Sequence, residues 1–170
     1  MGGLLSSYWG YPGDDELDPA SGLTGKQKRL VTETWGIMRQ DPMKLGIAVM
    51  MRLFTKHPDY RSQFHAFKDT PHEDLPKNKR FQAHASAIAN ALSTIIDSLK
   101  DPGLLEAILI SLGEKHHKRG QTIEHFNNLK LVLLAVFKEF LGSRWTPEVN
   151  DAWSKALDFV YSIIFKVYAL

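Results

Sequence analysis

The stretch that decides the fold is residues 80–116, RFQAHASAIANALSTIIDSLKDPGLLEAILISLGEKH. Its first part carries an apolar stripe at helical spacing, within an arc of about 100°. That stripe consists of Phe81, His84, Ile88, Ala91, Leu92, Ile95 and Leu99. Its second part carries a similar stripe, made of Leu105, Ile108, Leu109, Leu112 and His116. The stretch therefore predicts two consecutive amphipathic helices, separated at Asp101-Pro102, each with one histidine on its apolar face.

The two histidines, His84 and His116, lie 32 residues apart. Each one alone is more simply explained as a hydrogen-bonded core residue, and both would be core residues in a haem-free helical interaction domain. As a pair on adjacent helices they favour a second interpretation, in which two imidazoles face each other across a gap. A flat apolar ligand with a metal at its centre suits such a gap, and haem is a ligand of this kind.

Capping signals place the other helices. Thr24 and Gln27 have the spacing of a capping box. Four further sites put a capping Asp or Thr directly before a proline that suits the first helical turn: Asp41-Pro42, Thr70-Pro71, Asp101-Pro102 and Thr146-Pro147. We expect an all-α domain with seven or eight helices, at residues 25–40, 42–56, 58–63, 71–75, 78–99, 102–118, 123–141 and 147–168.

The composition is that of one ordinary globular domain, with 170 residues, 44% of them hydrophobic, 24% charged, and a net charge of +2. So small a net charge does not predict nucleic-acid binding. The absence of cysteine excludes disulfides, thiolate metal ligands and a cysteine nucleophile. No run of about 18 apolar residues predicts a membrane span. No secretory signal begins the chain, so we expect a cytoplasmic protein.

The first residues differ from the rest in charge. Residues 1–20 hold four carboxylates and no Lys or Arg, a net charge of −4 against +6 for the remainder. Together with their glycines and prolines they predict a flexible extension over residues 1–22, followed by a folded domain over 23–170. The start, MGGLLS, also matches the N-myristoylation pattern with Gly2 as acceptor. A flexible leader is the simpler interpretation, and a single acyl chain would bind a membrane only marginally.

The other five histidines give no comparable pattern: they are His57, His65, His72, His117 and His125. Neighbouring helical residues diverge, so His116 and His117 cannot bind one ion together. His125 has no partner at zincin spacing, and the chain contains neither a phosphate-binding glycine loop nor a Gly-x-Ser-x-Gly elbow. We expect all five to be surface or helix-end residues.

Taken together, these motifs resemble those of the globin family over about residues 23–168. Residues 80–85 (RFQAHA) resemble the distal helix, and residues 112–116 (LGEKH) resemble the proximal segment. Trp35 and the stretch 52–58 (RLFTKHP) fit further family positions. The resemblance implies a globin fold and haem b, with His116 as the proximal axial ligand and His84 as the distal histidine. The second ring nitrogen of His116 then needs an acceptor, either a backbone carbonyl or a hydroxyl such as that of Ser111.

The resemblance also implies the other walls of the pocket. Phe64 would stack on the haem, and the remaining lining would come from Phe67, Met50, Ile88, Leu112, Phe126 and Leu129. Lys115 and Arg119 would pair with the haem propionates, with Lys68, Arg80 and Lys118 as further candidates; the alternative is an ordinary solvated helix face. Three residues depart from the family pattern and leave the pocket's polarity open: Gln121 and Met50 where other side chains are usual, and Ala87 for a polar or basic residue.

The sequence of residues 112–116 and the short connection to Phe126 resemble those of neuroglobin-like and arthropod-type intracellular globins. This implies reversible binding of O₂, and of CO and NO, for storage, transport or facilitated diffusion. His84 would either donate a hydrogen bond to bound O₂ or, as this branch favours, ligate the iron in the ligand-free state. The alternative is redox chemistry or sensing: NO dioxygenation, nitrite reduction or electron transfer, with a cellular reductase as partner. The protein itself would be a monomer or weak dimer.

Overall fold

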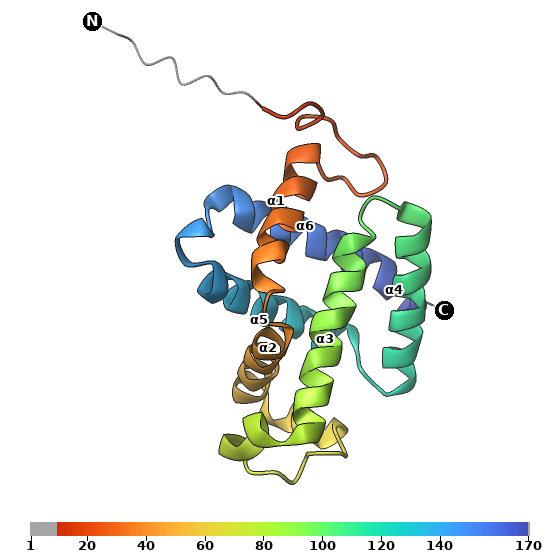
Figure 1. The fold of residues 1–170 in the computed structure, drawn as a ribbon. Coiled ribbons are helices and arrows are strands. Elements are labelled where there is room, and N and C mark those ends of the chain that lie inside the picture. The colour runs from red at the N-terminus through yellow and green to blue at the C-terminus, as the bar shows by residue number, and fades with distance from the viewer. Residues whose placement is uncertain (1–9, 170) are drawn as a thin grey trace, which may run out of the picture.

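The computed structural model describes residues 10–169, which form an all-α arrangement, as predicted (Figure 1). The α-helices are α1 (Gly25–Met38), α2 (Pro42–Lys56), α3 (Lys79–Asp97), α4 (Pro102–Lys118), α5 (Ile123–Leu141) and α6 (Pro147–Ile164). The 3₁₀ helices are η1 (Pro58–Gln63), η2 (His72–Lys77), η3 (Gly142–Arg144) and η4 (Phe165–Ala169). Gly2 lies outside the described residues, so its myristoylation stays a prediction.

Four of the five predicted caps are confirmed. Thr24 forms a reciprocal capping box with Gln27 at the start of α1. At α2, α4 and α6, the cap is an Asp or Thr side chain that accepts a hydrogen bond from the backbone N–H three residues on. In each case proline follows directly, where its missing N–H costs nothing.

The predicted cap at Thr70 is wrong. The helix that follows, η2, begins one residue later than predicted, at His72, and has no side-chain cap. The Thr70 hydroxyl instead accepts a hydrogen bond from Nδ2 of Asn78 at 3.0 Å. Asn78 is the N-cap of α3, and its Oδ1 accepts from the backbone of that helix, which leaves its amide nitrogen free to bind Thr70. The two side chains thus tie the ends of the η2 segment together.

Three helices end earlier than predicted, at Met38, Asp97 and Ile164. At the end of α3, Ser98 is already outside the helix, and its backbone N–H is shared among the carbonyls of residues 94–96. After Ile164 the chain continues as the tighter helix η4. The last turn of a helix can tighten into a 3₁₀ turn while the same residues remain buried, so the apolar periodicity continues past the end of the α-helix. Periodicity alone therefore does not locate these helix ends.

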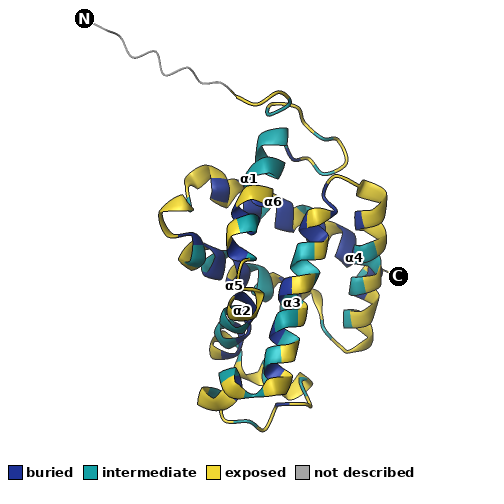
Figure 2. Cartoon of the chain, viewed as in Figure 1, coloured by how far each residue is buried: buried dark blue, intermediate teal, exposed yellow. Residues whose placement is uncertain are grey.

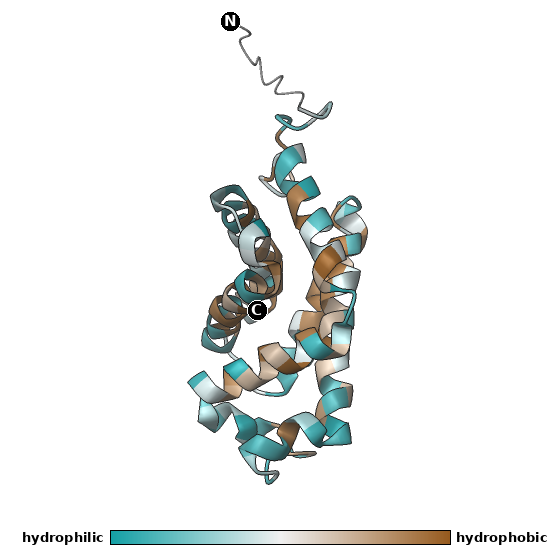
Figure 3. Ribbon diagram, turned by 60° about the vertical axis from the view of Figure 1, so that its left-hand side comes forward, coloured by the Kyte–Doolittle hydropathy of each residue, from teal (hydrophilic) through white to brown (hydrophobic). Residues whose placement is uncertain are grey.

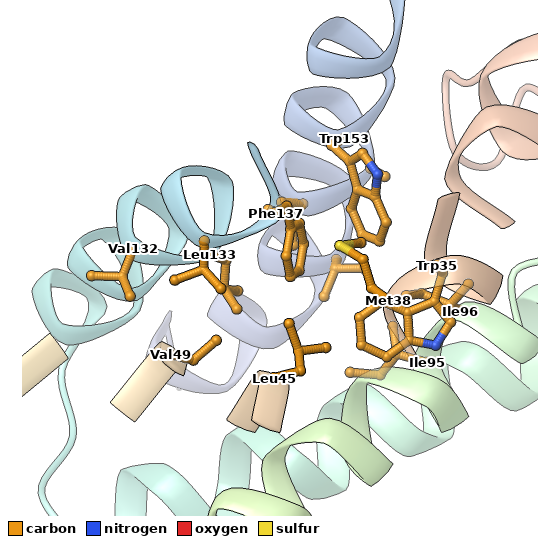
Figure 4. Close-up of a cluster of buried hydrophobic side chains, with 14 of the residues drawn as sticks. Trp35, Met38, Leu45, Val49, Ile95, Ile96, Val132, Leu133, Phe137 and Trp153 are labelled. Carbon is orange, nitrogen blue, oxygen red and sulfur yellow. The ribbon is translucent and has the colours of Figure 1, made fainter. Parts of the chain in front are cut away.

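Side chains from α1, α2, α3, α5 and α6 meet in a buried cluster of the core that is built around aromatic rings (Figure 4). The Trp35 ring centroid lies 6.0 Å from that of Phe137 and 6.1 Å from that of Trp153, and the last two are 4.6 Å apart. The indole N–H of Trp153 donates to the Thr34 hydroxyl at 2.9 Å, so this buried polar group is satisfied. Ile95 and Ile96 place the C-terminal part of α3 in this cluster.

The two histidine-bearing helices are held by different neighbours. α3 crosses α2 closely at Gly46, where an added Cβ would lie only 2.0 Å from the carbonyl oxygen of Ala85. α4 packs instead on α6 and η4, with Gly113 against Ile164. Figure 3 shows hydrophobic residues on the facing sides of two helical layers, and Figure 2 shows that much of α4 is exposed. α3 and α4 therefore form two separate walls.

The described part of the predicted extension is hydrogen-bonded to α1. Asp14 accepts from the Arg29 guanidinium at 2.8 Å, and Asp18 pairs with Lys28. Leu17 forms an isolated β-bridge with Thr24. The division of the chain at residue 22 stays a prediction. Within residues 10–169, no helix is both long and apolar enough to cross a membrane.

Candidate functional site

His84 lies in the middle of α3 and faces a cluster of aromatic side chains. Its ring is edge-on to Phe64, with centroids 5.0 Å apart, and 6.0 Å from the ring of Phe67. Phe67 in turn contacts Phe81 one turn earlier on α3. Within residues 10–169, neither ring nitrogen of His84 has a protein hydrogen-bond partner. The structure thus brings the predicted Phe64 and Phe67 to the predicted distal histidine and leaves that imidazole free to bind another group.

His116 lies in the last turn of α4, and one hydrogen bond fixes the state of its ring. Its Nδ1 lies 2.8 Å from the carbonyl oxygen of Leu112, one turn earlier. A carbonyl can only accept, so Nδ1 carries the proton and Nε2 keeps a free lone pair. The acceptor is this backbone carbonyl, and the Ser111 hydroxyl is exposed. The ring also packs 5.4 Å from Phe126.

Both imidazoles are held in the neutral form. Burial is the main cause that lowers the pKa of His84, and the positive charges of Arg119 and His116 lower it further. Burial likewise lowers the pKa of His116, with the Leu112 hydrogen bond acting in the opposite direction and Arg119 in the same one. A neutral imidazole is the form that binds a metal. Arg119 is the C-cap residue of α4 and is exposed.

Next to His116 an apolar cavity of about 120 Å³ extends inward between the helices. Five predicted pocket residues line it: Ile88, Leu112, His116, Phe126 and Leu129. It continues to Val31 and Trp153 in the core. Four other predicted pocket residues do not line this cavity: Met50, Phe64, Phe67 and His84. An apolar wall beside a free imidazole nitrogen suits an apolar ligand that binds through a metal.

Sequence reasoning missed three residues around the site. Tyr161 lines the cavity with a buried hydroxyl that has no hydrogen-bond partner among the described residues, and burial raises the pKa of this phenol. The Tyr168 hydroxyl donates to the backbone carbonyl of Gln121 at 2.9 Å, which fixes the connection after α4. His125, expected to be an ordinary helix-end residue, completes a capping box with Thr122 at the start of α5. Only the last had a local signal, the three-residue spacing from Thr122.

At the open end of the site lie the predicted cations. Lys115 and Arg119 are both exposed, and neither has a carboxylate partner within residues 10–169. Gln121 bridges this end to Gln63 at the end of η1, with 2.6 Å between its Nε2 and the Gln63 Oε1. Among the described residues, the Gln121 Oε1 is buried without a donor. Exposed cations without carboxylate partners suit a ligand that carries acid groups at its edge.

A family model for Globin matches residues 47–164, well over half of the chain. The chain is a globin. The globin family binds haem and, through it, diatomic gases such as O₂.

Relatives of this globin include several with named functions. Cytoglobin-1 of Oryzias latipes is 29% identical over 156 residues, which cover 91% of this globin and 88% of the relative. The anaerobic nitrite reductase HBII of Casuarina glauca is 30% identical and covers 84% of this globin and 91% of its own chain. The two relatives have different names, although each is similar in sequence to this globin.

Solved structures confirm the fold. The hexa-coordinate haemoglobin of Drosophila melanogaster superimposes with a TM-score of 0.78 and 32% identity, covering 84% of this globin and 93% of that chain. A hexacoordinated haem protein from an anhydrobiotic tardigrade gives a TM-score of 0.83 at 19% identity and covers 90% and 99%. The second likeness speaks to the fold alone. The predicted globin fold is therefore confirmed.

Proposed function

We propose that this globin holds haem b between α3 and α4, with His116 as the proximal ligand and His84 as the sixth ligand when no gas is bound, and that it binds O₂ reversibly. One observation carries the proposal. The imidazoles on the two walls are both neutral, and each has a nitrogen lone pair that no described residue uses.

The role of each residue follows from its surroundings. Haem would be held by His116 and His84 and would supply the iron that binds a diatomic gas. His116 presents Nε2, because Leu112 holds the proton on Nδ1 and thereby raises the basicity of the ring. Phe64, Phe126 and the apolar cavity wall exclude water from this space.

The absence of a hydrogen-bond partner for His84 among the described residues supports the six-coordinate form. A half-buried imidazole without a hydrogen-bond partner carries an unpaid desolvation cost, and a bond to iron would remove it. The same imidazole can donate a hydrogen bond to a bound gas once it leaves the iron. The Drosophila structure, described as hexa-coordinate, supports this arrangement in a similar chain.

The visible spectrum of the deoxygenated ferrous protein tests this proposal. We expect sharp, split α and β bands from two histidine ligands, and one broad band after His84→Leu. His117→Leu changes the exposed neighbour of His116 and should leave the spectrum unchanged. A broad band in the unaltered protein would overturn the six-coordinate form, and the absence of a Soret band after expression with haem would overturn haem binding itself.

Redox chemistry is a second candidate, favoured by the relative that is named a nitrite reductase. A cellular reductase would be the partner, and the protein would act in the cytoplasm. Two rates separate the candidates. Slow oxidation of the ferrous protein in air favours reversible O₂ binding, whereas rapid NO production from nitrite without oxygen, sustained by a reductant, favours the enzyme.

A further inference from the structure

The loop over residues 64–70 carries the two phenylalanine rings that pack on His84. It follows η1 and belongs to the connection between α2 and α3, at one end of the molecule (Figure 1). The ring centroid of Phe64 lies 5.0 Å from that of His84, and the centroid of Phe67 lies 6.0 Å from it. The two phenylalanine rings are also stacked on each other at 5.4 Å. Because no described residue hydrogen-bonds to the imidazole, these ring contacts hold it in its orientation.

The backbone of this loop is built from short turns. Three backbone N–H groups each donate to the carbonyl oxygen three residues earlier, at 2.9–3.1 Å: those of Phe64, Phe67 and Thr70. These hydrogen bonds join residues that are close in the sequence, so they fix no contact with another element. Local turns of this kind open at a low free-energy cost unless other contacts hold them. A further contact is therefore needed to keep the loop closed.

The Arg61 guanidinium, at the end of η1, makes this contact. Its Nη2 donates to the backbone carbonyl oxygen of Lys68 at 2.6 Å and also to that of Thr70. This nitrogen carries two hydrogens, one for each carbonyl. The Nε of the same guanidinium is covered by protein atoms, and among the described residues no carboxylate pairs with Arg61. The guanidinium therefore packs inside the loop and binds its two last carbonyls.

The far end of the loop is attached to the helix that carries His84. The Thr70 hydroxyl accepts a hydrogen bond from Nδ2 of Asn78 at 3.0 Å. The Oδ1 of Asn78 caps α3 and accepts from the backbone N–H of Phe81 at 3.1 Å. The Phe81 ring in turn contacts Phe67, with centroids 5.3 Å apart. The guanidinium thus holds the loop on the side of η1, and Asn78 holds it on the side of α3.

We propose that Arg61 is a positioning residue for the bond between His84 and the iron. Its guanidinium keeps the loop over residues 64–70 closed, and the closed loop holds Phe64 and Phe67 against the imidazole. In that orientation His84 competes with an incoming gas, whereas an open loop lets the ring turn away. Arg61 therefore sets the rate at which His84 leaves the iron, acting only through the loop. This inference rests on the proposed six-coordinate haem site.

The binding of CO to the deoxygenated ferrous protein, followed after rapid mixing, tests this role. In a six-coordinate protein the binding rate reaches a plateau at high CO, which equals the rate of His84 release. Arg61→Leu should raise this plateau about tenfold, because it removes two hydrogen bonds from a charged donor. Arg61→Lys keeps the charge and the donors on a different stem and should give an intermediate plateau. The matched control is Arg52→Leu, which breaks an ion pair with Glu139 on α5 and should leave the plateau unchanged.

Two further measurements separate positioning of His84 from a general effect on the fold. In a His84→Leu background no imidazole has to leave the iron, so Arg61→Leu should leave the rate of CO binding unchanged. Hydrogen exchange of the Thr70 amide N–H, measured by NMR in the CO-bound protein, reports opening of the loop directly. This exchange should be faster in Arg61→Leu and unchanged in Arg52→Leu.

The other outcomes would each overturn a definite statement. Unchanged exchange of the Thr70 amide would show that the guanidinium does not close the loop. Faster exchange with an equal or lower plateau would show that the closed loop does not hold His84 on the iron. Equal acceleration with and without His84 would mean that Arg61 only supports the fold. One broad band in the ferrous spectrum of the unaltered protein would instead overturn the proposed six-coordinate form, and this inference with it.

Discussion

Gly46→Ala tests whether the crossing of α2 and α3 sets the position of His84. The added Cβ would lie 2.0 Å from the carbonyl oxygen of Ala85 and 2.5 Å from its carbonyl carbon. Both clashing atoms are backbone, so no side chain can rotate away. An ordinary contact needs 3.4 Å or more. The helices must therefore separate by more than about 1 Å, which is enough to forfeit a quarter to a half of the dispersion energy at each contact.

The expected cost is about 3 kcal/mol of unfolding free energy, at the upper end of ordinary overpacking. This is below the stability of a typical domain, so the variant should still fold. Gly36→Ala is the matched control, because nothing lies within 4 Å of a Cβ at that helical glycine. It should stabilise the protein by about 0.4–1 kcal/mol.

Urea unfolding of the ferric haem protein, followed by circular dichroism, measures both changes. The ferrous spectrum of Gly46→Ala adds a second readout, since His84 directly precedes Ala85 and moves with it. If His84 ligates the iron as proposed, the strained bond should weaken the split bands. If Gly46→Ala unfolded within about 0.5 kcal/mol of the unaltered protein, the helix crossing would not be the tight constraint that the geometry indicates.

Three further predictions concern single groups. Thr34→Val leaves the indole N–H of Trp153 without its acceptor and should cost about 1–3 kcal/mol in urea unfolding; an unchanged midpoint would contradict this. Burial lowers the pKa of His84 and His116, so the unfolded chain takes up protons first as the pH falls below about 6.5. Unfolding free energy should therefore decrease over that range, and His84→Leu should flatten the slope, whereas an identical slope would argue against it. Asp18 has its pKa lowered to about 2, chiefly by its hydrogen bond to Lys28. Asp18→Asn should thus be less stable at neutral pH, and the difference should vanish as the pH falls from about 4 to about 2; a constant difference would refute this.

The parts of the site that could be predicted depend only on residues within a single helix. The stripes around His84 and His116 repeat at helical spacing, so their direction follows from the sequence alone. The hydrogen bond from His116 to Leu112 is also local, because residues four apart lie one above the other. These local rules place both imidazoles without any knowledge of which helices pack together.

The parts that could not be predicted join segments far apart in the chain. Gln63 and Gln121 are separated by 58 residues, and their contact depends on how η1 meets the connection after α4. The same Gln63 amide lies 3.2 Å from Nε2 of His125, a residue 62 positions further along the chain. The close contact of Gly46 with Ala85 is also non-local, because no residue near Gly46 in the sequence predicts it. Contacts of this kind produce no periodic pattern in the sequence, so they cannot be predicted from hydrophobic periodicity.

The separate packing of α3 and α4 explains why a bound cofactor would stabilise the fold of this globin. α3 is fixed to α2, and α4 is fixed to α6 and η4, so the walls that carry His84 and His116 are stabilised independently. They are joined by the Asp101-Pro102 turn at one end and by the Gln63–Gln121 bridge at the open end of the site. In the proposed haem site, a ligand held by both imidazoles would link these two separately packed helices. Its binding free energy would add to the stability of the fold, and exchange of His84 for a gas would remove one link while His116 keeps the other.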